Sequence, residues 1–207
     1  MSGGPRVAAV LLAAGQSRRL GRPKQLLEWR GEPLVRRTAS MLLRTSARPV
    51  VAVLGHLEDD VSRALRGLDV ERVTNPRFAD GQSTSVAAGV RALGARCDAA
   101  LFVPCDQPRL RARTVEGLVQ AAGSNPGAVV RPIYDGRPGA PVLFPAALFP
   151  ELLRLEGDRG GRQILERHRK RTVDVPIDDR AEAFDIDTDD DVATLHALPD
   201  LPPEDSP

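Results

Sequence analysis

The chain has 207 residues, of which 42% are hydrophobic and 28% charged, a balance typical of one soluble globular domain with a full core. Its 29 basic and 28 acidic residues exclude the strong basic excess of a general nucleic-acid or membrane-surface binder. No apolar run approaches the ~20 residues of a membrane helix, and no secretory signal precedes the first apolar run, so we expect a cytoplasmic protein.

The first half of the sequence alternates short apolar runs with helical patterns. Strands are expected at residues 7–12, 49–54, 70–74 and 99–103. Three helical patterns lie between them. The first covers residues 34–45, the second follows the second strand and ends at residue 66, and the third runs from a capping Ser83 to residue 93. This alternation indicates βαβ units and a parallel sheet.

The second half is less regular. A helix is expected at residues 114–122, and strands at 128–134 and 140–144 are joined by a link so short that it favours an antiparallel hairpin. Short helices flank residues 157–161, an edge strand covers 172–175 and a last helix covers 189–198. We therefore predict an α/β fold, a three-layer, Rossmann-like, mostly parallel mixed sheet, in a single domain over residues 1–198. Residues 199–207 hold four prolines and three acids, which predicts a disordered tail.

The two cysteines form neither a CxxC pair nor a disulfide framework. Cys105 ends an apolar run, which favours a buried free thiol over a catalytic one. The sequence does not decide whether Cys105 has a role.

The loop at residues 12–24 gives the clearest chemical signal. A glycine directly after the first strand, Gly15, lets backbone N–H groups approach an anion, and ligands of open α/β sheets bind beyond the carboxyl ends of strands. Neither the Walker A pattern nor the GxGxxG dinucleotide pattern is present. A solvated basic loop is the alternative interpretation. Four cations within seven residues suit a triphosphate: Arg18, Arg19, Arg22 and Lys24.

This segment resembles the LAAGxSxRxGxxK signature of nucleotidyltransferases with a nucleotide-diphospho-sugar transferase fold, and among them the molybdenum cofactor cytidylyltransferases. The resemblance implies that the loop binds the triphosphate of an incoming nucleotide, with Arg19 and Lys24 as catalytic residues on the phosphates. Residue 14 is alanine where related guanylyltransferases have glycine, which favours the cytidylyl branch and CTP. The implied nucleotide-binding residues of this loop are Leu12, Ala13, Ala14, Gly15, Ser17, Arg19 and Lys24.

Residues 75–89 combine a turn with a helix start, whose N–H groups and hydroxyls suit the edge of a nucleobase. Simple capping of the helix by Ser83 is an equal alternative. The stretch resembles the family segment that lines the base and ribose pocket. The residues implied by that resemblance are Asn75, Gly81, Ser83 and Ser85.

Two acids are candidate metal ligands. Asp106 follows a buried strand, where a hard cation such as Mg²⁺ takes one or two carboxylates plus phosphate oxygens. A turn before Pro108 is the alternative role for Asp106. The resemblance implies that Asp106 and Asp187 bind Mg²⁺, with Asp106 also catalytic. Asp185 shares a face with Asp187 if a strand continues there, and the acids at 189–191 are explained as a helix first turn.

Two further segments resemble acceptor-side elements of the same family. Residues 136–144 are similar to its G-x-P-V-L-F strand, and residues 157–163 to its G-D-x-G-A-R loop. A helix–helix turn with a salt bridge is the alternative for the second segment. The implied acceptor-binding residues are Pro141, Asp158, Gly160 and Arg162.

The resemblance covers residues 7–198. It implies transfer of CMP from CTP to a molybdopterin-type cofactor with release of pyrophosphate, and makes a molybdoenzyme or its chaperone a partner to test. Three alternatives stay open at this point: a cytidylyl- or guanylyltransferase with another phosphate acceptor such as an isoprenoid precursor, a non-catalytic nucleotide- or cofactor-binding chaperone, and a plain α/β interaction domain.

Overall fold

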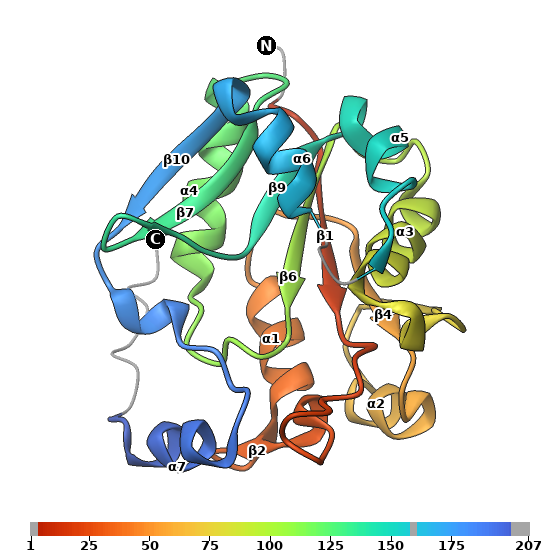
Figure 1. Ribbon diagram of the computed structural model, residues 1–207, viewed down its shortest axis with the longest axis vertical. Helices are drawn as coiled ribbons and strands as arrows, with labels where there is room; N and C mark the ends of the chain where they lie inside the picture. The colour runs from red at the N-terminus through yellow and green to blue at the C-terminus, as the bar shows by residue number, and fades with distance from the viewer. Residues whose placement is uncertain (1–3, 158–160, 200–207) are drawn as a thin grey trace.

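A computed structural model describes residues 4–157 and 161–199 (Figure 1). In these residues one sheet has the strand order β10-β7-β9-β6-β1-β4-β5, with β8 paired to β7. Strand β9 runs antiparallel to both of its neighbours, and β8 runs antiparallel to β7, while the other pairs are parallel. The strands are β1 (Val7–Leu12), β4 (Val50–Leu54), β5 (Glu71–Thr74), β6 (Ala99–Pro104), β7 (Val129–Tyr134), β8 (Arg137–Pro138), β9 (Val142–Pro145) and β10 (Thr172–Ile177), and a separate ribbon pairs β2 (Glu28–Trp29) with β3 (Glu32–Pro33).

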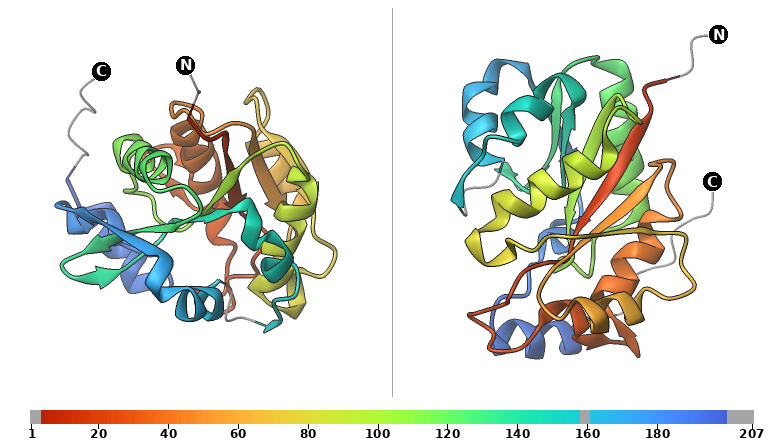
Figure 2. Two further views of the ribbon diagram at one scale, coloured as in Figure 1. Left: turned by 90° about the horizontal axis from the view of Figure 1, so that it is seen from above. Right: turned by 90° about the vertical axis from the view of Figure 1, so that its right-hand side faces the viewer.

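Helices cover both faces of the sheet, so the molecule has three layers (Figure 2). One face carries α1 (Leu34–Leu42), α2 (Glu58–Ala64) and α4 (Ala112–Ser124). The other carries α3 (Gln82–Leu93), α5 (Phe149–Leu152) and α6 (Arg162–Arg167). The last helix, α7 (Asp189–Ala197), lies beside β2 at one end of the molecule, where Leu195 and Trp29 belong to one small apolar cluster.

The central strands are apolar throughout because both of their faces are covered. In β1, Val7, Ala9 and Leu11 pack into the core under α1, α2 and α4, whereas Ala8 and Val10 pack into the core under α3. A strand with side chains alternating between two buried layers has no solvent face, so no polar residue interrupts it. The predicted three-layer, mostly parallel α/β sheet is confirmed.

The strand order places a crevice at the carboxyl ends of β1 and β6. From β1 the chain proceeds to β4 and β5 on one side, then crosses to β6 on the other side of β1. Such a reversal of strand order opens a crevice in which ligands of α/β sheets bind. The register pairs Leu12 with Pro104. The loop after β1 and the acid after β6 therefore begin side by side.

The second half confirms the predicted antiparallel link, because β7 and β9 pair antiparallel, with β9 inserted between β7 and β6. Residues 200–207, most of the expected tail, lie outside the described residues. None of the helices in the described ranges has the length and apolar character that a membrane crossing requires.

The structure differs from the sequence expectations at two places. Ser83 does not cap α3, because the helix begins at Gln82 and Gly81 is its N-cap, with φ 113°. That backbone conformation is open to glycine and unfavourable for serine, so the N-cap lies two residues before the predicted Ser83. No strand continues through residues 184–187. The side chains still alternate there, since Ile186 is buried and its N–H donates to the Asp106 carbonyl at 3.1 Å.

Candidate functional site

A first cavity of about 390 Å³ opens at the carboxyl ends of β1 and β6. The loop after β1 forms one wall, and it turns at Ser17 (φ 53°) and Gly21 (φ 70°). The start of α3 forms the opposite wall. The predicted site residues that line this cavity are Leu12, Ala14, Gly15, Ser17, Arg19, Lys24, Gly81, Ser85, Asp106 and Asp187.

Three other predicted nucleotide-binding residues lie behind this lining. The Ala13 carbonyl faces inward and accepts a hydrogen bond from Gln25 Nε2 at 3.1 Å. The buried Asn75 side chain donates to Ser85 Oγ at 3.0 Å, which fixes a residue of the cavity wall without reaching the cavity itself. Ser83 is buried and belongs to a groove on the other side of α3.

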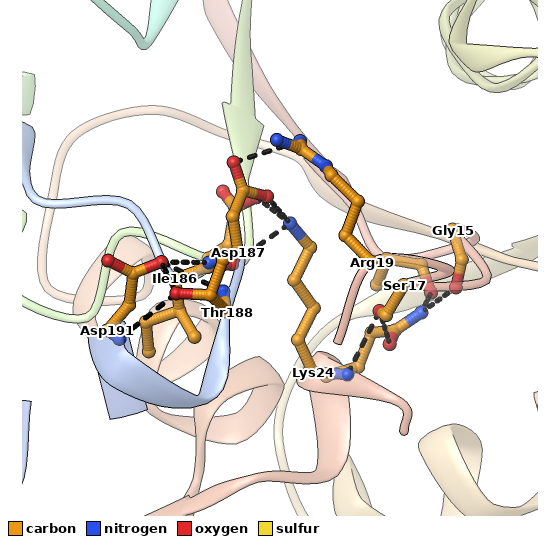
Figure 3. A network of polar contacts seen from close by, with 11 residues as sticks. Gly15, Ser17, Arg19, Lys24, Ile186, Asp187, Thr188 and Asp191 are labelled. Carbon is orange, nitrogen blue, oxygen red and sulfur yellow. Dashed lines mark hydrogen bonds and ion pairs between the residues drawn. The ribbon is translucent and has the colours of Figure 1, made fainter. Parts of the chain in front are cut away.

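The Lys24 ammonium contacts both acids that the sequence singled out, Asp106 and Asp187. Figure 3 shows it beside Asp187. Its Nζ donates to Asp106 Oδ2 at 2.5 Å, to Asp187 Oδ1 at 3.2 Å and to the Ile186 carbonyl at 3.2 Å. Arg19 pairs with the other oxygen of Asp187 at 2.9 Å. Although burial alone lowers it, the pKa of Lys24 is raised by Asp106 and Asp187, so the ammonium stays charged.

These carboxylates have the chemistry of a divalent-ion site. Asp106 and Asp187 come from segments far apart in sequence and converge on one cationic group, the Lys24 ammonium, which acts as a stand-in ion. The described residues contain no group of three or more His, Cys, Asp or Glu side chains arranged to hold an ion. A hard cation bound by two carboxylates completes its coordination with water and phosphate oxygens. The donor set therefore fits Mg²⁺ or Mn²⁺ carried by a nucleotide.

A third acid, Asp185, was not assigned from the sequence and lies beside this pair. Asp185 is an exposed residue, yet desolvation of its carboxyl by the surrounding protein, together with the neighbouring Asp106 and Asp187, raises its pKa to about 6, against the effect of a hydrogen bond from Gln107. Gln107 is only 4% exposed and follows Asp106 directly. The sequence signal for the Gln107–Asp185 pair is the position of Gln107 directly after Asp106, at the end of a buried strand. A buried amide at such a position needs a polar partner.

A second cavity of about 1400 Å³ adjoins the first and shares Arg19, Lys24, Asp106 and Asp187 with it. Three further arginines line it, namely Arg137, Arg162 and Arg180. The predicted acceptor residue Arg162 is thus at this cavity. Pro141 is outside its lining, between the lining residues Ala140 and Val142. Asp158 and Gly160 lie outside the described residues.

The two cavities meet at the acids, so one molecule in each would bring two reactive groups together there. The charges at the junction, two carboxylates with Lys24 and Arg19, suit phosphate groups and a divalent ion. Cys105 lines the first cavity but is 5% exposed, and burial raises the pKa of its thiol to about 12. The predicted buried free thiol is confirmed.

The chain also resembles proteins of known sequence and structure. The model of the MobA-like NTP transferase domain matches residues 9–172. Nicotine blue oxidoreductase of Paenarthrobacter nicotinovorans is 33% identical over 194 residues, covering 89% of this chain and 93% of that protein. A probable molybdenum cofactor guanylyltransferase of Opitutus terrae is 35% identical over 182 residues, covering 84% of this chain and 87% of that protein.

Among solved structures, Rv0371C of Mycobacterium tuberculosis in complex with manganese is 26% identical, with a TM-score of 0.75, and the match covers 93% of this chain and 98% of that one. Solved nucleotidyltransferases of lower identity share the fold. The predicted nucleotide-diphospho-sugar transferase fold is therefore confirmed.

Proposed function

This chain belongs to the family of MobA-like NTP transferase domains, and from that premise we propose that it transfers CMP from CTP to the phosphate of a molybdopterin-type molybdenum cofactor, releasing pyrophosphate. The observation that carries the proposal is the junction of the two cavities at Asp106, Asp187 and Lys24. A nucleotide in the first cavity and an acceptor in the second would meet there.

In the proposed reaction an acceptor phosphate oxygen attacks the α-phosphorus of the nucleotide. A new oxygen–phosphorus bond forms as the bond to the leaving pyrophosphate breaks. The acceptor oxygen is already anionic, so the reaction needs no protein nucleophile. Catalysis then consists of positioning the two phosphates and stabilising their charge.

The cationic side chains divide this work. Lys24 and Arg19 neutralise the phosphates that depart as pyrophosphate, while the loop from Leu12 to Lys24 holds them through backbone N–H groups. Asp106 and Asp187 would hold Mg²⁺, which when bound neutralises phosphate charge. The manganese complex of Rv0371C supports a divalent ion in a protein of this fold.

The finer assignments of nucleotide and acceptor have separate supports. CTP is supported by the alanine at position 14, whose side chain is buried on the loop of the first cavity. The molybdopterin-type acceptor is supported by the name of the Opitutus terrae relative and by the arginines of the second cavity, which suit an anionic molecule. A molybdoenzyme or its chaperone is the partner expected to receive the product.

Pyrophosphate release with CTP, GTP, ATP or UTP, each with and without molybdopterin cofactor, tests the proposal. We expect release with CTP only when the cofactor is present, and its loss in Asp106→Ala with the fold retained by circular dichroism. Equal turnover in Asp106→Ala, or no release with any pair of substrates, contradicts it. Because one relative is a nicotine blue oxidoreductase, reduction of nicotine blue is followed in parallel, and we expect none.

A further inference from the structure

Gln25 is a buried side chain whose hydrogen bonds go to the loop of the first cavity. It lies in the short 3-10 helix Lys24–Leu26, directly after the loop, and is 1% exposed. Its Nε2 donates to the Gly15 carbonyl at 2.6 Å and to the Ala13 carbonyl at 3.1 Å. The two hydrogens of the amide group are thus both used on loop carbonyls.

These bonds fix the direction of two peptide groups. In a planar trans peptide the N–H points opposite to the C=O. With the carbonyls of Ala13 and Gly15 turned toward Gln25, the N–H groups of Ala14 and Gln16 point the other way. Both Ala14 and Gln16 line the first cavity. The buried amide therefore binds two carbonyl oxygens that would repel a phosphate, and it leaves the N–H groups of two cavity-lining residues on the opposite side of their peptide planes.

The same side chain is linked to Lys24. Ser17 Oγ accepts a hydrogen bond from the Lys24 backbone N–H at 3.0 Å and donates to Gln25 Oε1 at 3.5 Å. The loop and the start of the 3-10 helix are thereby held together, and Lys24 projects its ammonium to the acids from this base. Gln25 thus supports both kinds of phosphate-binding group, the backbone N–H groups and the lysine.

We propose that Gln25, which borders the first cavity with only 1% of its surface exposed, is a positioning residue for the triphosphate that acts through the peptide groups of residues 13–16. This inference rests on the proposed nucleotidyltransferase function and assigns a role to a residue outside the reacting groups. It predicts a specific defect: loss of Gln25 weakens binding of the phosphates and leaves recognition of the base, the ribose and the acceptor unchanged.

Two substitutions test the role. Gln25→Glu keeps the shape but replaces the donating amide with an oxygen that faces two carbonyls, and Gln25→Met keeps the length without polar atoms. The matched control is Gln120→Glu on the exposed side of α4. Isothermal titration with CTP, inorganic pyrophosphate and CMP is carried out well below each variant's melting temperature, with KM for CTP and for the acceptor measured separately.

We expect both Gln25 variants to lose about tenfold or more in affinity for CTP and for pyrophosphate, equivalent to about 1.4 kcal/mol, with CMP affinity and acceptor KM unchanged. Gln120→Glu should match the wild type. Variants that melt earlier but bind CTP and pyrophosphate like the wild type would show a merely structural role and overturn the inference. So would equal losses for CMP and CTP.

A second measurement needs no variant and covers the case in which Gln25 substitutions fail to fold. Addition of pyrophosphate to the wild-type protein should shift the backbone amide NMR signals of Ala14 and Gln16. Unchanged signals at saturating pyrophosphate overturn the inference while leaving the proposed function in place. Wild-type protein that binds neither CTP nor pyrophosphate overturns both.

Discussion

Replacing Gly55 with alanine is expected to lower both the stability of the protein and its affinity for nucleotide. Gly55 follows β4, and a Cβ there would lie 2.7 Å from Phe78 Cβ and 2.9 Å from Ala14 Cβ. Carbon atoms in contact normally stay about 3.5–4.0 Å apart. Since Ala14 belongs to the loop of the first cavity and Phe78 lines the same cavity, the added methyl group must displace one wall or the other.

Overpacking of this kind costs about 1–3 kcal/mol. In a chain of this size, each kcal/mol lowers the melting temperature by about 2–4 °C. Thermal unfolding and titration with CTP measure the two effects. The matched control is Gly117→Ala inside α4, where a Cβ meets no atom within 4 Å and alanine should stabilise the helix by about 0.5–1 kcal/mol. A Gly55→Ala protein with unchanged melting temperature and CTP affinity would refute this reasoning.

Two further predictions concern other parts of the structure. Burial raises the pKa of Glu182 above its ordinary 4.5, so the stability associated with this residue is fully present below pH 4.5 and is lost as the pH rises through the raised pKa. In urea unfolding, Glu182→Gln should therefore gain stability relative to the wild type as the pH rises above 4.5, and a difference independent of pH would contradict this. Arg162→Gln should raise the KM for the acceptor and leave CTP affinity unchanged, whereas Arg18→Gln, on the exposed loop, should leave the acceptor KM unchanged. Equal acceptor KM values in the wild type and Arg162→Gln would contradict a role of this arginine in binding the acceptor.

The sheet was predictable because its strands are short and buried on both faces. An uninterrupted apolar run such as residues 7–12 has one stable environment, a central parallel strand covered by helices. Local starts and ends were less predictable. The cap of α3 was missed because the backbone of Gly81, with φ 113°, sets the start of the helix, and that angle leaves no mark in the pattern of polar residues.

Asp106 was predictable as a site residue from its position, and Asp187 from the family resemblance, but the partners of these acids were not predictable. Asp106 follows a buried strand, and such a strand has its carboxyl end at the ligand-binding edge. Lys24 reaches both Asp106 and Asp187 only in the folded chain. Asp187 is 163 residues away in sequence, and no local pattern encodes a contact over that separation. The role of Gln25 was not predictable from the sequence, because its partners are backbone carbonyls and backbone carbonyls are present at every position.

Asp106 and Asp187 are proposed to hold one divalent ion beside the nucleotide. Electron paramagnetic resonance of Mn²⁺ with CTP, in the wild type and in Asp106→Asn, Asp187→Asn and Asp189→Asn, tests it directly. Asp189 is the control, since it is an exposed acid paired with Arg22 at the start of α7. We expect CTP-dependent Mn²⁺ binding in the wild type and Asp189→Asn, and its loss in both other variants. Wild-type Mn²⁺ affinity in Asp106→Asn and Asp187→Asn would contradict it.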